Sequence, residues 1–148
     1  MSTSPHLPFE TALEVRNRCI CLHLQRAARR VARVFDDALR PLELTNGQFS
    51  LLMSLNRPEP AAIVTLAASL AMDRTTVTAN LKPLERRGLV KVTVDKADKR
   101  GRRLMLTTAG RDLLIEALPI WKKTHAEIDI LLARPDPDAL RADLRALA

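Results

Sequence analysis

Residues 72–90 read "MDRTTVTANLKPLERRGLV" and predict a capped helix with two unlike faces. Asp73 is a favourable N-cap residue, and Gly88 stands where a left-handed C-cap is required. Three apolar residues share one face at helical spacing, namely Val77, Leu81 and Leu84. The opposite face carries short polar, small and basic side chains. We therefore expect one face to pack in a core and the other to be free for recognition.

The residues before this helix predict a shorter helix joined to it by a turn. Residues 61–72, "AAIVTLAASLAM", indicate an extended stretch or short strand, then a helix capped by Thr65, then a turn near Met72. Two helices of this kind form a helix-turn-helix, whose second helix enters the DNA major groove. Small side chains allow its backbone to approach, and hydroxyl groups reach bases or phosphates.

Residues 92–107, "VTVDKADKRGRRLMLT", predict a basic β-hairpin directly after that helix. Val92 and Val94 alternate with polar residues, as do Leu104 and Leu106 on the returning strand. Gly101 lies in a connection that carries a cluster of cations and two acids. A basic hairpin in this position is a wing, so the segment predicts a winged helix-turn-helix.

Amphipathic helices are expected on both sides of this unit. Residues 18–42 predict one long helix that ends near Pro41, and residues 44–56 predict a second helix with a capping box of Thr45 and Gln48. After Thr107 or Thr108 as the cap, residues 109–133 predict a long helix bent near Pro119. Asp136 and Pro137 then begin a last helix. The fold class is mainly α with a small β-hairpin wing, in the order of four helices, a hairpin and two helices.

Positive charge is concentrated in two segments of the chain. The formal net charge is +7, residues 72–103 carry a net +6, residues 16–40 carry a net +5, and the remainder is acidic. Such a distribution is typical of a protein that binds a polyanion. A solvated basic face kept for solubility is the alternative explanation of the charge alone.

Several functional classes find no support in the sequence. It contains no Gly-rich phosphate loop and no cluster with metal-ligand spacing, so we expect no enzyme, no cofactor and no metal site. An interaction module that does not bind DNA would leave the wing unexplained. No signal peptide and no run of about 18 apolar residues occurs, which predicts a cytoplasmic protein without a membrane partner.

Residues 72–90 and 95–110, the latter reading "DKADKRGRRLMLTTAG", resemble the recognition helix and wing of the MarR family of transcriptional regulators. The resemblance extends over nearly the whole chain. It implies a winged helix-turn-helix lobe at residues 41–108 between dimerisation helices at residues 1–40 and 109–148. The implied function is sequence-specific DNA binding by a homodimeric repressor, which recognises a near-palindromic operator and is released by a small ligand such as an aromatic acid.

The resemblance also assigns roles to individual residues. It implies base contacts from Thr75, Thr76, Thr78 and Ala79, and phosphate contacts from Arg74, Lys82 and Arg86. Asp98, Lys99 and Arg100 match the wing motif, in which an aspartate braces the loop and an arginine enters the minor groove. Because Lys99 replaces the usual first arginine, that contact is assigned to Arg100 or Arg102. Asp98, together with Asp95, is expected to hold the arginines extended.

Cys21 raises an alternative function. It aligns with the reactive cysteine of the peroxide-sensing OhrR branch of the family, which implies a thiol-based redox sensor. That branch also uses tyrosines, and this chain has none, so plain helix packing of Cys21 remains open. Cys21, His23 and Arg26 form the candidate effector or redox site, and His125 is a further candidate for an effector pocket. We expect Trp121 to fill the core or an interface.

Overall fold

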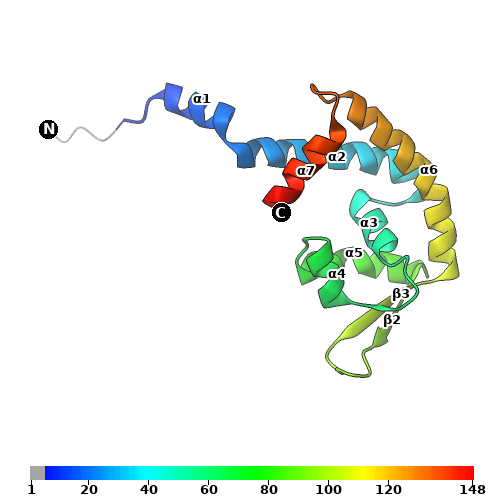
Figure 1. Cartoon of the computed structure of the whole chain (residues 1–148). Coiled ribbons are helices and arrows are strands. Elements are labelled where there is room, and N and C mark those ends of the chain that lie inside the picture. Colours follow the sequence, from blue (N-terminus) through cyan, green and yellow to red (C-terminus); the bar gives the residue numbers. More distant parts are fainter. Residues whose placement is uncertain (1–5) are drawn as a thin grey trace. The chain divides into compact units, whose positions relative to one another are not determined.

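The structure is a computed structural model and describes residues 6–148. The described chain divides between Arg33 and Val34 into two compact units. The N-terminal unit contains α1 (Phe9–Arg18) and the first part of α2 (Ile20–Leu39) (Figure 1). The expectation of one long helix from residue 18 to Pro41 is therefore wrong at its start. Cys19, with φ −66° and ψ 106°, is extended and separates the two helices.

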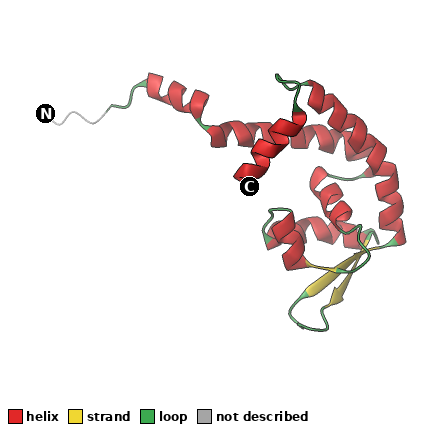
Figure 2. Ribbon diagram, in the orientation of Figure 1, coloured by secondary structure: helices red, strands yellow, loops and turns green. Residues whose placement is uncertain are grey.

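The C-terminal unit contains the remaining elements (Figure 2). In chain order these are the end of α2, a 3-10 helix (Arg40–Leu42), α3 (Asn46–Ser54), β1 (Ala61–Ala62), α4 (Ile63–Ser69), α5 (Arg74–Arg86), β2 (Val90–Val94), β3 (Arg102–Leu106), α6 (Thr108–Ile130) and α7 (Pro137–Leu147). The described residues thus form one more α-helix before the hairpin than the sequence indicated. The fold class, mainly helical with a small sheet, is confirmed.

The sheet has three antiparallel strands in the order β1-β3-β2. Val92 pairs with Leu104 across the hairpin, and Ala61 pairs with Leu104 on the other side. The extended stretch expected near residue 61 is therefore a strand of the same sheet. Leu104 is buried, but Val92 is only partly buried and Val94 is 53% exposed. The hairpin extends away from the core towards its tip, so apolar residues near the tip are exposed although they alternate with polar ones.

Leucines dominate the core between α3, α4, α5 and the sheet. Those with no exposed surface are Leu39, Leu51, Leu52, Leu66, Leu84 and Leu104. The ring of Trp121 lies 6.1 Å from that of Phe49 and 6.4 Å from that of Phe35, both in a stacked arrangement. Trp121 therefore packs against the core but is only partly buried, which agrees with the first of the two expected locations, core or interface, without deciding between them.

Helix caps agree with the sequence at most positions. Thr45 and Gln48 form the expected capping box, and the side chain of Asp136 caps α7 with Pro137 at its first turn. Thr107, and not Thr108, caps α6. The expected cap at Thr65 is wrong, because α4 already begins at Ile63 and Ala62 occupies its N-cap position without a side-chain hydrogen bond. Thr65 lies inside α4, because the helix begins directly after β1.

Candidate nucleic-acid interface

Helices α4 and α5 form a helix-turn-helix with a buried inner surface. Ala71, with φ 50°, makes the turn in a left-handed conformation. Leu66 of α4 and Val77 of α5 are fully buried, and α5 also contacts α3. Because the apolar face of α5 faces these neighbours, its other face remains exposed along the helix.

The exposed face of α5 contains a shallow hollow of about 320 Å³. Its lining consists of Arg74, Thr75, Thr78, Ala79 and Lys82. The two threonines and Ala79 lie along the helix between Arg74 and Lys82, so hydroxyl and methyl groups have a cation at each end. This combination is suited to base edges flanked by phosphates. The structure thus brings together five of the seven residues that the sequence assigned to this helix.

The other two helix candidates lie outside this hollow. Arg86 is exposed one turn beyond Lys82, on the same ridge of the helix. Thr76 is exposed, but its backbone N–H donates to Asp73 Oδ1 at 2.7 Å in the N-cap of α5. This hydrogen bond, followed by one from the Thr76 hydroxyl, holds the pKa of Asp73 below its usual value of 3.8.

Asp95 braces the wing through an arginine side chain, as expected for one of the two acids of the hairpin. Arg103 Nε donates to Asp95 Oδ2 at 3.2 Å, and Arg103 Nη1 donates to the Pro60 carbonyl at 3.3 Å. The wing is therefore tied at its base to the loop before β1. The backbone N–H of Ala97 donates to Asp95 at 2.9 Å. This bond, more than the charge of Arg103, holds the pKa of Asp95 below 3.8.

Asp98 braces the backbone of the loop and no arginine side chain. Its Oδ1 accepts from the backbone N–H of Arg100 at 3.0 Å. The expectation that Asp98 holds an arginine side chain is therefore wrong. Arg102 Nη1 turns back to the carbonyls of Gly101, at 3.2 Å, and Lys99, at 3.4 Å. Within residues 6–148, no hydrogen bond or ion pair involves the exposed guanidinium of Arg100.

Arg87 is a supporting residue that sequence reasoning missed. Its guanidinium donates to the Glu43 carbonyl at 2.7 Å and to the Leu42 carbonyl at 3.1 Å. It thereby ties the C-terminal end of α5 to the connection before α3. The sequence did contain a sign of this role. Adjacent helical residues point about 100° apart, so only one of Arg86 and Arg87 could share the ridge of Lys82, and the other had to point elsewhere.

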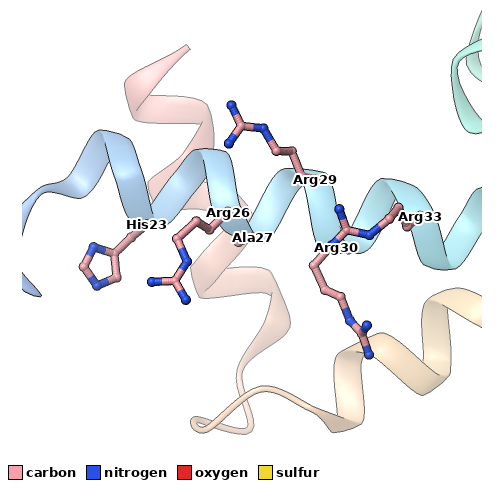
Figure 3. A pocket seen from close by; sticks show the side chains of 6 residues that line it. All are labelled: His23, Arg26, Ala27, Arg29, Arg30 and Arg33. Carbon is pink, nitrogen blue, oxygen red and sulfur yellow. The ribbon is translucent and has the colours of Figure 1, made fainter. Parts of the chain in front are cut away.

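The candidate effector residues lie on α2. Cys21 is exposed, and Gln25 Nε2 donates to its Sγ at 3.4 Å. His23 and Arg26 lie together along a hollow of about 570 Å³ (Figure 3). Cys21 does not line that hollow. His125 lines a different one, with Trp121 and Arg141.

Comparison with known proteins identifies the family. A family model described as MarR family matches residues 44–101. The chain is 38% identical to the transcriptional regulator MosR of M. tuberculosis, solved in complex with DNA; the match covers 88% of this chain and 93% of that one, with a TM-score of 0.79. The chain belongs to the MarR family.

Other MarR-like structures extend the comparison. The transcriptional repressor CouR, bound to a 23-mer DNA duplex, is 31% identical over 97% of this chain and 99% of that one, with a TM-score of 0.77. BpsR of Bordetella bronchiseptica, whose DNA binding is regulated by 6-hydroxynicotinic acid, is 27% identical over 88% of this chain and 98% of that one, with a TM-score of 0.78.

Family and fold together make this protein a DNA-binding transcriptional regulator of the MarR family with a winged helix-turn-helix, and they point away from an enzyme. No helix among residues 6–148 is long and apolar enough to cross a membrane.

Proposed function

We propose that the protein is a homodimeric repressor that binds a near-palindromic operator and is released by a small ligand. The observation that carries DNA reading is the hollow on α5, where Thr75, Thr78 and Ala79 lie between Arg74 and Lys82. In this proposal the three central residues, with Thr76 beside them, face base edges in the major groove. Arg74, Lys82 and Arg86 contact phosphates and fix the register of the helix.

The wing supplies a second contact to the duplex. Arg100 enters the minor groove, because its guanidinium is free of internal partners, and Arg102 is the second candidate. Lys99 contributes to the phosphate contacts. Asp98 shapes the loop through the backbone of Arg100. The Asp95–Arg103 pair keeps the wing in place.

Exposed apolar side chains support the proposed dimer. They occur near both ends of the chain, and those at least 60% exposed are Leu7, Phe9, Val64, Ile20, Ile115, Ile130, Leu131 and Leu147. All but Val64 belong to the terminal regions, which a second copy would cover. A two-fold dimer presents two recognition helices to half-sites about 34 to 36 Å apart.

Release of the operator would follow from a shift between two conformations. A ligand that binds better to the conformation with the wrong spacing of recognition helices lowers operator affinity. His23 and Arg26 offer an anion site on α2. The regulation of BpsR by 6-hydroxynicotinic acid supports an aromatic acid as one class of ligand.

A gel-shift titration with the promoter of the protein's own gene tests the proposal. We expect a shift that survives competition by unrelated DNA of equal length. The affinity should weaken steeply with salt, because the slope of log affinity against log salt concentration is about −0.9 for each neutralised phosphate. Equal competition by unrelated DNA would refute sequence-specific repression.

Thiol-based sensing through Cys21 is a second candidate function. The favouring observation is that Cys21 is exposed while Gln25 Nε2 donates to its sulfur at 3.4 Å. A hydroperoxide would transfer one oxygen to the thiolate, giving a sulfenic acid and releasing an alcohol. In the Cys21→Ser variant, peroxide should no longer cause the protein to dissociate from operator DNA. An unchanged peroxide response in that variant would eliminate this candidate.

A further inference from the structure

An uninterrupted basic segment lies at the start of the chain. Between Val15 and Phe35 the sequence contains six arginines and no aspartate or glutamate. Four of them lie on α2, which we call the α2 arginine cluster: Arg26, Arg29, Arg30 and Arg33. In Figure 3 the side chains of Arg26 and Arg30 extend to one side of the helix and that of Arg29 to the other. They frame the hollow of about 570 Å³, which His23 and Ala27 also line.

The neighbouring carboxylates are already engaged elsewhere. Glu14 Oε1 pairs with Arg18 at 2.8 Å, and Asp37 pairs with Arg40. Asp36 Oδ1 accepts from the backbone N–H of Asn46 at 2.7 Å. Across the part of the chain that the structure describes, no carboxylate forms an ion pair with the α2 arginine cluster. The four guanidinium groups that line the hollow therefore have no ion-pair partner among residues 6–148, and those of Arg26 and Arg30 extend to the same side of α2.

The spacing of these arginines is unfavourable for the helix by itself. Arg26 and Arg30 are four residues apart, as are Arg29 and Arg33. Like charges at this spacing repel one another and destabilise a helix. Elsewhere the chain balances such a charge, since Arg141 pairs with Asp129 at 2.8 Å and with Asp138 at 2.9 Å. A bound polyanion would relieve the repulsion within the α2 arginine cluster.

The lining of the hollow also restricts the class of ligand. It contains no aromatic ring apart from the imidazole of His23, and Ala27 is its single apolar residue. The carboxylate of an aromatic acid would balance one of four guanidinium groups. Guanidinium groups remain charged at all physiological pH values and match phosphate oxygens with paired donors. The volume lies within the range of small-molecule sites.

We propose that the α2 arginine cluster binds a small molecule carrying two or more phosphate groups. The inference rests on the proposed ligand regulation, and at the hollow on α2 it replaces an acid with one carboxylate by a molecule with several phosphate groups. It concerns the free protein, so its test does not require the operator.

Isothermal titration calorimetry of the full-length protein with inorganic tripolyphosphate tests this site, at constant ionic strength set with chloride. We expect saturable binding that weakens at least about tenfold in Arg26→Gln/Arg30→Gln, because charge-assisted hydrogen bonds to phosphate are lost. The control, Arg57→Gln/Lys123→Gln, removes two exposed cations outside the hollow and should bind within about twofold of the wild type. Circular dichroism establishes that each variant is folded.

Three results would overturn the proposal. The first is no binding of tripolyphosphate at about 1 mM. The second is equal weakening by the control variant, which would indicate general charge attraction. The third is binding of benzoate or orthophosphate as tight as that of tripolyphosphate. These arginines could instead contact DNA phosphates, and salt titration of operator binding tests this. The slope of log affinity against log salt concentration would then be reduced by about two in Arg26→Gln/Arg30→Gln. That result would also overturn the small-molecule site.

Discussion

Arg100 and Arg102 lie two residues apart on the wing, but their side chains have different environments. Arg102 donates to the carbonyls of Gly101 and Lys99, whereas the guanidinium of Arg100 has no internal partner among residues 6–148. A contact to DNA made by Arg102 must first give up these hydrogen bonds. The difference favours Arg100 as the residue that enters the minor groove.

Replacing Arg100 tests this assignment. Arg100→Ala should lower operator affinity by about 5-fold to 150-fold, the range expected for loss of a contact worth about 1 to 3 kcal/mol. Fluorescence anisotropy at several salt concentrations measures the loss, and Arg102→Ala is the matched control with a smaller expected effect. Equal affinities of Arg100→Ala and the wild type at every salt concentration would exclude the wing contact.

Threonines of α5 should differ in their effect on base discrimination. Thr78 lines the hollow on α5, whereas Thr76 is held in the helix cap and does not. Thr78→Ala should therefore raise the ratio of non-specific to specific affinity more than Thr76→Ala does. Competition between operator DNA and a sequence-scrambled duplex measures that ratio. If Thr76→Ala relaxed discrimination more than Thr78→Ala, base reading would have to be reassigned.

Most candidate residues on α5 could be predicted from the sequence, whereas the hydrogen-bond partners in the wing could not. Residues spaced along one face of a helix follow from its period, so the hollow on α5 was predictable. The partner of an aspartate in a hairpin depends on register, which the turn decides. Here Thr93 pairs with Arg103, which places that arginine beside Asp95. A motif centred on Asp98 could not show this.

At the scale of elements, the break between α1 and α2 was not predictable from periodicity. Apolar residues recur at helical spacing on both sides of Cys19. No proline or glycine marks the break, and α1 has neither a side-chain cap nor a buried residue. The bounds of β1 were equally difficult to predict, because a strand of two residues is defined by its pairing with β3 and not by its own sequence.

Acid should destabilise the recognition helix and the wing together. The pKa values of Asp73 and Asp95 are lowered in the folded protein, so their stabilising contribution is complete above pH 3.8 and is lost as the pH falls through the lowered values. The free energy of unfolding, measured by urea denaturation, should therefore decrease below about pH 4. Asp73→Asn/Asp95→Asn should flatten this decrease, with Asp112→Asn/Asp143→Asn, which removes the same number of charges at two exposed positions, as the control. An equally steep decrease in the double variant would contradict the assignment.

Gly110 allows α6 to pack closely against the connection between α5 and β2. A Cβ atom at this position would lie 2.2 Å from the Leu89 carbonyl oxygen, which is a backbone atom and cannot turn aside. Gly110→Ala should lower the free energy of unfolding by about 1 to 3 kcal/mol. Gly47→Ala is the control, since its Cβ would meet only the Asn80 side chain at 3.5 Å. A stable Gly110→Ala variant, with an unchanged denaturation midpoint, would contradict this packing.

In the whole molecule, the sequence predicted amphipathic helices near both ends of the chain that one winged lobe does not require. The structure agrees in that the end of α6 and helix α7 keep exposed apolar residues, including Ile130, Leu131 and Leu147. Family membership and fold class followed from the motif at residues 72–90 and the wing. The proposed ligand site did not follow from the sequence, because an anion site depends on which arginines lack an ion-pair partner, and that is a property of the folded chain.

A two-fold dimer reads two half-sites with paired recognition helices, so the spacing of the half-sites should determine operator affinity. Operator DNA mapped by footprinting should be bound with half-site centres about 10 base pairs apart. Inserting five base pairs between them moves one half-site to the opposite face of the duplex. We expect the insertion to lower affinity to the level of a single half-site. Unchanged affinity for the spaced operator would contradict binding by a two-fold dimer with paired recognition helices.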